Sequence, residues 1–313
     1  MALPELLAPA GGMEQLSAAL RCGADAVYAG GKRFSARSRA FNLDDEDIPR
    51  AAQMCHMYGA KLYIAANTLI SDGMAKDFAD FVRLCAMAGA DGYIVQDMGA
   101  ARLIRSIAPT APVHASTQTS VHTAEGARLL KSLGFSRVVP ARELDRDSVR
   151  RIADTGVETE IFVHGALCMS VSGQCYMSAF LSSGERSANC GSCAQACRLP
   201  FSAAGRRGYT ALSLKDLSLL PRIDEAVECG AASLKIEGRM KRPEYVAAAV
   251  SELRKALDGG KPDMELLEGV FSRGGFTDGY FTGKRNNMFG MRSREDADAS
   301  RSLMPELHKL YRN

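Results

Sequence analysis

Short apolar runs alternate with amphipathic stretches along the first 260 residues of the chain. Runs rich in Val, Ile, Ala and Tyr with little internal polarity are typical of strands in a buried parallel sheet. They predict strands at 5–10, 26–30, 61–67, 92–97, 113–118, 137–141, 158–164 and 234–237. The stretches that follow carry apolar residues at helical spacing. They predict helices at 13–22, 44–58, 74–88, 98–107, 123–133, 145–155 and 243–257.

About eight strand-then-helix units in roughly 250 residues predict an α/β protein with a TIM-like (β/α)8 barrel. Glycines at 23, 89 and 230, each directly before a predicted strand, have the place of helix C-caps in a repeating unit. The alternative is an open doubly wound sheet. It is disfavoured because no G-x-G-x-x-G turn follows the first strand.

The pattern divides the chain into a barrel and an extension. We expect the barrel to occupy residues 1–260, with a cysteine-rich insertion at 165–200 after the seventh strand. Residues 261–313 form a C-terminal extension in which the alternation weakens. The extension is predicted to contain a glycine-rich loop or short hairpin at 273–284, a polar extended tail at 285–300 and a short helix at 303–311.

Composition narrows the class of protein. The chain has 313 residues, 46% of them hydrophobic and 24% charged, and a net charge of +3, which is ordinary for a globular domain. No run of about 18 apolar residues predicts a membrane span. The first residues lack a basic leader, so we expect no signal peptide and a cytoplasmic protein. There, nine cysteines favour free thiols, metal binding or catalysis over disulfides.

Polar side chains follow the predicted strands at their carboxyl ends, where barrel enzymes place their active sites. These residues are Asn67, Gln96, Asp97, Ser116, Gln118, Arg142, His164, Lys235, Glu237 and Arg239. Any one of them could be a solvated strand end. Their position on the same rim as the cysteine-rich insertion favours a functional site.

Five of the nine cysteines lie between His164 and Arg198. So many thiols within about 30 residues of a cytosolic chain indicate a metal centre. An iron–sulfur cluster accepts their irregular spacing, whereas zinc, the alternative, prefers paired C-x2-C knuckles. The other four, Cys22, Cys55, Cys85 and Cys229, fall in helices or at a helix end and are expected to be structural.

Several segments together resemble peptidase family U32, the collagenase-like protease family. They are EIFVHGALC (160–168), SGQC (172–175), GSCAQACR (191–198), LKDL (214–217) and SLKIEGR (233–239). The opening ELLAPAG (5–11) and GADAVY (23–28), and the later RGGFTDGY (273–280), are similar to the two ends of the family pattern. The resemblance covers about residues 3–284.

This resemblance implies a TIM-like barrel and, in many members, a four-iron four-sulfur (4Fe-4S) cluster. It implies RNA hydroxylation of tRNA or rRNA with prephenate as the oxygen donor, while the older family name implies a peptidase. The residues that match the family's ligands are Cys168, Cys175 and Cys193. The place of a further family ligand is occupied by Ser218. Cys197 is then the favoured fourth ligand, with Cys190 as the other candidate.

The hypothesis favoured is an iron–sulfur-dependent RNA-hydroxylating enzyme. His164 is assigned as general acid or base, Lys235 and Arg239 as groups that hold a carboxylate or phosphate, and Glu237 as the group that orients Arg239. Asn67, Gln118 and Arg142 are assigned to substrate binding. RNA is the expected partner, with a second protein of the same family as a further one. The basic loop with Lys32, Arg33, Arg37 and Arg39 is a candidate contact for RNA phosphates, or only a solvated loop.

Two alternatives stay open at this stage. One is a peptidase with zinc held by cysteines and His164 and with Glu160 or Glu237 as base, or with Cys168 as nucleophile. The sequence lacks the H-E-x-x-H and G-x-S-x-G motifs that would support it. The other alternative is a non-catalytic iron–sulfur scaffold subunit.

Overall fold

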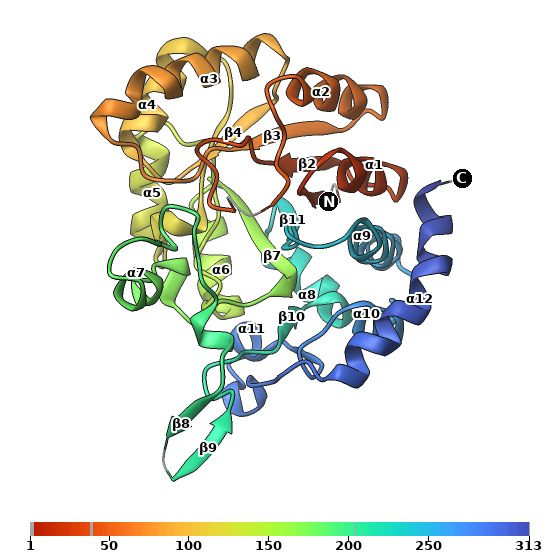
Figure 1. The fold of residues 1–313 in the computed structure, drawn as a ribbon. Helices are drawn as coiled ribbons and strands as arrows, with labels where there is room; N and C mark the ends of the chain where they lie inside the picture. The colour runs from red at the N-terminus through yellow and green to blue at the C-terminus, as the bar shows by residue number, and fades with distance from the viewer. Residues whose placement is uncertain (1–2, 38–39, 204, 313) are drawn as a thin grey trace.

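A computed structural model describes residues 3–37, 40–203 and 205–312. Within these residues, eight parallel strands close into a barrel (Figure 1). Closure is made by the last strand, which pairs with the first at Leu234 and Leu6 and with the seventh at Leu234 and Ile161. The predicted barrel is therefore confirmed, and the open sheet is excluded. The strands are β1 (Glu5–Ala10), β2 (Ala26–Ala29), β3 (Lys61–Ala65), β4 (Gly92–Val95), β5 (Val113–Ala115), β6 (Arg137–Val138), β7 (Glu158–Ala166) and β11 (Ser233–Ile236).

Helices surround the barrel close to where the sequence places them. Local chemistry sets their ends: the side chains of Asp97, Thr123 and Asp145 each accept a backbone N–H at a helix start. The helices are α1 (Met13–Arg21), α2 (Asp47–Met57), α3 (Ala75–Met87), α4 (Met98–Ile107), α5 (Ala124–Ser132), α6 (Arg146–Ala153), α8 (Ile223–Glu228) and α9 (Pro243–Leu257), with one-turn 3-10 helices η1 (Asp72–Met74) and η2 (Thr117–Thr119). In the described ranges, no helix combines the length and apolarity needed to cross a bilayer.

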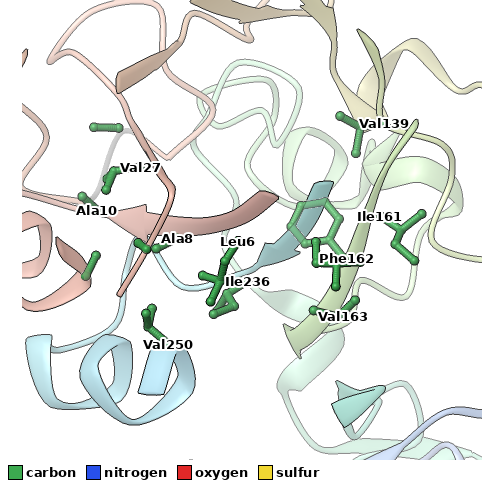
Figure 2. Close-up of a cluster of buried hydrophobic side chains, with 14 of the residues drawn as sticks. Leu6, Ala8, Ala10, Val27, Val139, Ile161, Phe162, Val163, Ile236 and Val250 are labelled. Carbon is green, nitrogen blue, oxygen red and sulfur yellow. The ribbon is translucent and has the colours of Figure 1, made fainter. Parts of the chain in front are cut away.

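The main hydrophobic core lies between the strands and the surrounding helices. Figure 2 shows part of it, where Leu6 of β1, Ile236 of β11 and Val250 of α9 are completely buried. Burying a side chain of this size contributes about 2 kcal/mol. The inside of the barrel is different, because Glu160 and Lys235 project into it together with aromatic rings. The apolar layer therefore fixes the barrel wall and leaves its interior to polar groups.

Between β7 and α8 the chain makes a long excursion that continues past residue 200. Its strand β10 pairs antiparallel with the end of β7, placing Ser218 opposite His164. The hairpin of β8 and β9 projects away from the barrel (Figure 1). The excursion contains η3 (Val171–Gly173), α7 (Met177–Leu181), η4 (Ala196–Arg198), β8 (Phe201–Ala203), β9 (Arg206–Tyr209), β10 (Asp216–Ser218) and η5 (Leu220–Arg222).

The C-terminal segment differs from the sequence prediction in two places. Instead of a hairpin at 273–284, the strand β12 (Phe276–Thr277) pairs in parallel with β10. Instead of an extended tail, residues from Arg294 form a 19-residue helix. Its start is capped reciprocally: Asp296 N–H donates to Ser293 Oγ, and Ser293 N–H donates to Asp296 Oδ2. The elements are α10 (Met264–Val270), β12, α11 (Gly279–Thr282), η6 (Arg285–Asn287) and α12 (Arg294–Arg312).

Candidate active site at the barrel mouth

A cavity of about 630 Å³ opens where the carboxyl ends of the strands meet the cysteine-rich excursion. It brings together most of the residues that the sequence singled out. Those lining it are Asn67, Gln118, Arg142, Lys235, Glu237, Arg239, Cys168, Cys175, Cys193 and Cys197. Side chains separated by up to 172 positions, from Asn67 to Arg239, thus face one space.

Five charged residues in the lining, Arg37, Arg142, Lys235, Glu237 and Arg239, form what we call the charged wall of this cavity. Glu237 is at its centre. Its Oε2 atom accepts a hydrogen bond from Arg142 at 3.0 Å and lies 3.4 Å from Arg37 Nη2. Burial by itself raises the pKa of this carboxyl, but Arg37, Arg142 and Arg239 outweigh burial and lower the pKa to about 2. Glu237 is therefore a fixed anion at neutral pH. The prediction that it orients Arg239 is wrong, because its hydrogen-bonding partners are Arg142 and Arg37.

Arg239 instead holds the loop that follows β2. Its Nη1 atom donates to Ser35 Oγ at 2.7 Å, and its guanidinium carbon lies 5.8 Å from the centre of the Tyr28 ring. Burial, together with the nearby charge of Arg37, lowers the pKa of Arg239 to about 10. The guanidinium is still charged at neutral pH and forms part of the cavity wall.

Lys235 connects the cavity with an ion-pair chain inside the barrel. Its Nζ atom donates to Glu160 Oε1 at 2.7 Å, and the other oxygen of Glu160 lies 3.2 Å from Arg137. Arg137 in turn pairs with Glu5 at 2.6 Å. The side chain of Glu160 is completely buried, so both of its oxygens are committed to these partners. Glu160 consequently has no free oxygen with which to activate water or a substrate in the cavity.

Asn67 and Gln118 form a hydrogen-bonded amide pair in the cavity lining. The Asn67 Nδ2 group donates to Gln118 Oε1 at 3.2 Å, and Asn67 Oδ1 accepts from the backbone N–H of Ala36 at 3.1 Å. Gln174, from the cysteine-rich excursion, donates to the Gln118 carbonyl at 2.6 Å. The two amides therefore tie the strand ends to both loops that cover the barrel mouth.

His164 lies outside the set of residues that line the cavity. Its ring packs against Tyr245 and Phe276, with ring centres 5.9 and 5.1 Å away, and its Nδ1 atom is 3.3 Å from Ser218 Oγ. Burial, aided by the charge of Lys241, lowers its pKa to about 3. The geometry therefore overturns the assignment of His164 as general acid or base: it is neutral and shielded from any substrate in the cavity.

The four cysteines that line the cavity, at 168, 175, 193 and 197, form what we call the cysteine wall. They lie on loops and turns in the excursion after β7. Cys168 Sγ lies 2.9 Å from Ser170 Oγ, and Cys193 Sγ accepts from Gln195 N–H at 3.3 Å. Arg198 fixes the end of the segment by donating to the Leu214 carbonyl at 2.7 Å. Burial raises the pKa of Cys197; the charge of Arg198 lowers it, and the thiols at 168, 193 and 175 raise it again. The other three thiols therefore lie near enough to Cys197 to affect its charge.

The donor set suits a thiolate-bound metal centre. Four cysteines without histidine are the ligands of structural zinc or of an iron–sulfur cluster. In the described part of the chain, no three Cys, His, Asp or Glu side chains converge closely enough to hold a single metal ion. The fifth thiol, Cys190, is exposed and lies outside the cavity lining. Ser218, at the place of a family ligand, is buried against His164.

The basic loop after β2 does not present its charges as one surface. Lys32 and Arg33 pair with Asp44 and Asp45, each at 3.3 Å, whereas Arg37 points to Glu237. Arg39 lies outside the described residues. The loop therefore contributes to the cavity mainly through Arg37.

Sequence reasoning missed several side chains that shape the cavity. The rings of Tyr28 and Phe162 form its aromatic floor, and Arg198, Lys241 and Arg273 add positive charge. Within the described residues, seven basic and two acidic side chains line the cavity. Phe162 could have been identified by strand alternation, since it lies two positions from Glu160. The cavity is therefore suited to an anion with an apolar part.

Comparison with known proteins places these features in a family. The family model "Peptidase family U32" matches residues 11–289. Two relatives are named for RNA hydroxylation. The "tRNA hydroxylation protein P1" of Bacillus subtilis is 37% identical over 84% of this chain. The "23S rRNA 5-hydroxycytidine C2501 synthase" of Escherichia coli is 39% identical over 81% of this chain. The chain covers 65% and 39% of the lengths of these two relatives.

A third relative carries a different name. The "Collagenase" of Porphyromonas gingivalis is 35% identical over 90% of this chain and 74% of its own length. The match to the family model covers most of the chain and includes the barrel from β2 onward, the charged residues and the four cysteines that line the cavity. This chain therefore belongs to peptidase family U32.

Proposed function

We propose that this chain is an RNA-hydroxylating enzyme that acts on tRNA or rRNA. The observation that carries the proposal is one cavity that is lined both by four cysteines and by a cluster of guanidinium groups. Two of the relatives are named for hydroxylation of tRNA and 23S rRNA, which supports RNA as the substrate class. The proposed compartment is the cytoplasm, where thiols stay reduced.

The proposed cofactor is a 4Fe-4S cluster held by Cys168, Cys175, Cys193 and Cys197. These four thiols line the cavity, whereas Cys190 does not. When bound, such a cluster supplies iron for electron transfer or for binding an oxygen-bearing ligand. Zinc is the alternative occupant for four thiolates. Metal analysis of anaerobically purified protein distinguishes the two.

The charged wall would hold the oxygen donor, for which we propose prephenate. Arg142 and Arg37 already bind one carboxylate, that of Glu237, which supports binding of an anion at this position. Arg239 and Lys235 add further positive charge beside it. A guanidinium binds a carboxylate through paired hydrogen bonds, which would orient the donor. Asn67 and Gln118 would supply neutral donors and acceptors for the rest of the substrate.

The peptidase alternative finds less support in this geometry. Of its two candidate bases, Glu160 is fully engaged by Lys235 and Arg137. Glu237, whose pKa is lowered to about 2, is a weak base. His164 is buried away from the cavity and is unsuited to bind zinc or to activate Cys168. The specific observation in favour of this alternative is the relative named collagenase.

The decisive experiment is mass spectrometry of tRNA and rRNA nucleosides from a strain that lacks this gene. We expect one hydroxylated nucleoside to be missing and to return with the wild-type gene but not with the Cys168→Ala variant. An unchanged nucleoside profile would contradict the proposed function. Return of the nucleoside with the Cys168→Ala variant would contradict the role of the cysteine wall. Purification of the tagged protein under native conditions also tests for RNA and for a second protein of the same family.

A further inference from the structure

Lys235 lies at the floor of the cavity in an unusual setting for a lysine. It comes from β11 and is 4% exposed, yet it contributes to the cavity lining. Its Nζ atom lies 4.1 Å from the centre of the Tyr28 ring and 5.3 Å from that of Phe162. The amine is therefore shielded from bulk water by two aromatic rings while it faces a space large enough for a small molecule.

A proton acceptor is already in place beside this amine. Glu160 Oε1 is 2.7 Å from Lys235 Nζ, and its carboxylate is held from the other side by Arg137. Burial lowers the pKa of Lys235, although the charge of Glu160 opposes this change. Desolvation of this kind is how proteins turn a lysine into a nucleophile for carbonyl carbon atoms.

Two guanidinium groups flank the same rings. The guanidinium carbon of Arg142 lies 3.7 Å from the centre of the Phe162 ring, and that of Arg239 lies 5.8 Å from the centre of the Tyr28 ring. Each aromatic ring therefore contacts the amine and one guanidinium group. A molecule whose carbonyl carbon reached Lys235 could place a neighbouring carboxylate against Arg142 or Arg239.

We propose that Lys235 binds a 2-oxo carboxylic acid covalently, as an imine. The ammonium first transfers a proton to Glu160, and the free amine adds to the carbonyl carbon to give a carbinolamine. Loss of the hydroxyl group as water, with a proton returned from Glu160, leaves a protonated imine. Apart from the keto acid, the step consumes nothing and releases one water molecule, so it requires no oxidant or reductant.

The test is reductive trapping on the full-length protein. The purified protein is incubated with pyruvate and sodium borohydride, which reduces an imine to a stable secondary amine, and the modified lysine is located by peptide mass spectrometry. We expect the adduct at Lys235 at about tenfold or higher occupancy than at Lys61, an exposed lysine on β3. Lactate, which has the same carboxylate but a hydroxyl group in place of the keto group, should give no adduct.

Matched variants separate this chemistry from simple charge. Lys235→Arg keeps a cation beside Glu160 but cannot form an imine, so it should show no adduct at position 235. Glu160→Gln should lower the trapping rate, because the proton acceptor is lost. Mapping in the wild-type protein decides the question even if a variant fails to fold. Absence of an adduct at Lys235, or equal labelling of Lys61, overturns the proposal.

This inference concerns the cavity of the proposed function but can fail independently of it. A missing hydroxylated nucleoside in the deletion strain, combined with no trapping at Lys235, would support RNA hydroxylation and reject the imine. Trapping at Lys235 with an unchanged nucleoside profile would support the imine and reject RNA hydroxylation.

Discussion

The carboxylate of Glu237 and the guanidinium of Arg142 lie 3.0 Å apart at the barrel mouth, and both side chains are largely buried. The pair belongs to a larger group, because Arg37 contacts the same carboxylate oxygen. One internal anion thus balances a concentration of positive charge that would otherwise repel itself. We therefore expect the stability of the barrel mouth and any binding of an anion there to depend on the same atoms.

Replacement of Glu237 by Gln removes this anion and leaves its arginine partners uncompensated. We expect the free energy of unfolding to fall by about 3 kcal/mol, the usual effect of breaking a buried ion pair. Urea denaturation at pH 7 measures it. The control is Glu125→Gln, which breaks an exposed pair with Arg128 and should leave the free energy of unfolding nearly unchanged. Equal effects of the two substitutions would contradict this account.

The same carboxylate predicts a pH dependence. Its pKa is about 2 in the folded protein, against an ordinary value of 4.5. The folded state binds this proton less readily than the unfolded state, so the stabilisation is complete above pH 4.5 and is lost as the pH falls toward 2. Denaturation of the wild type between pH 5 and pH 2.5 should therefore show a loss of stability that is smaller in Glu237→Gln. If stability fell equally with pH in the wild type and in Glu237→Gln, the lowered pKa of Glu237 would be contradicted.

Substitution of His164 by Asn tests the correction of its role. The ring is buried, neutral and outside the cavity lining, so nucleoside hydroxylation should stay within about threefold of the wild type once the loss of stability is allowed for. A general acid or base would instead contribute about 100-fold or more. The measurement is hydroxylated nucleoside per unit of folded protein. A 100-fold loss in a folded variant would restore the catalytic assignment.

Serine substitutions distinguish the four cavity thiols from Cys190. Each of the variants at 168, 175, 193 and 197 should bind iron at least about tenfold more weakly after anaerobic reconstitution, because the metal loses one of four thiolates. Cys190→Ser should keep wild-type iron and sulfide content, since this thiol is exposed and outside the lining. Loss of the cluster in Cys190→Ser, with retention in Cys197→Ser, would exchange the two assignments.

Gly191 joins the cysteine wall to the loop after β2. It has a φ of +86°, and a Cβ atom there would lie 2.5 Å from the Ser35 carbonyl oxygen. Gly191→Ala should therefore lower stability by about 2 kcal/mol or more and weaken iron binding, because backbone must move. Gly184→Ala is the matched control, with a φ of +92° but no atom within 4 Å. The control should show only the strain of about 1 kcal/mol. Iron titration and urea denaturation of both variants measure the difference.

The fold could be predicted from the sequence because its signals are local. Strand runs and helical periodicity fix the elements one at a time, and a parallel sheet with intervening helices then allows few arrangements. The cavity residues at the strand ends follow from the same reasoning, since the carboxyl ends of barrel strands share one rim. The end of the helix at Arg294–Arg312 was predicted, at 303–311. Its first part was missed because the polar start gave no apolar periodicity, although the pair Ser293 and Asp296 carries a capping signal.

Tertiary structure alone decided which side chains meet. Two-residue alternation along β7 places His164 on the same face as Phe162, but the pairing register shifts between Lys235 and Ile236, and β10 covers the end of the strand. His164 therefore leaves the cavity. Glu237 likewise acquires Arg37 and Arg142 as partners, which lie 200 and 95 positions away. Periodicity specifies the barrel, whereas a register shift and long-range ion pairs, which depend on the packed fold, specify the site.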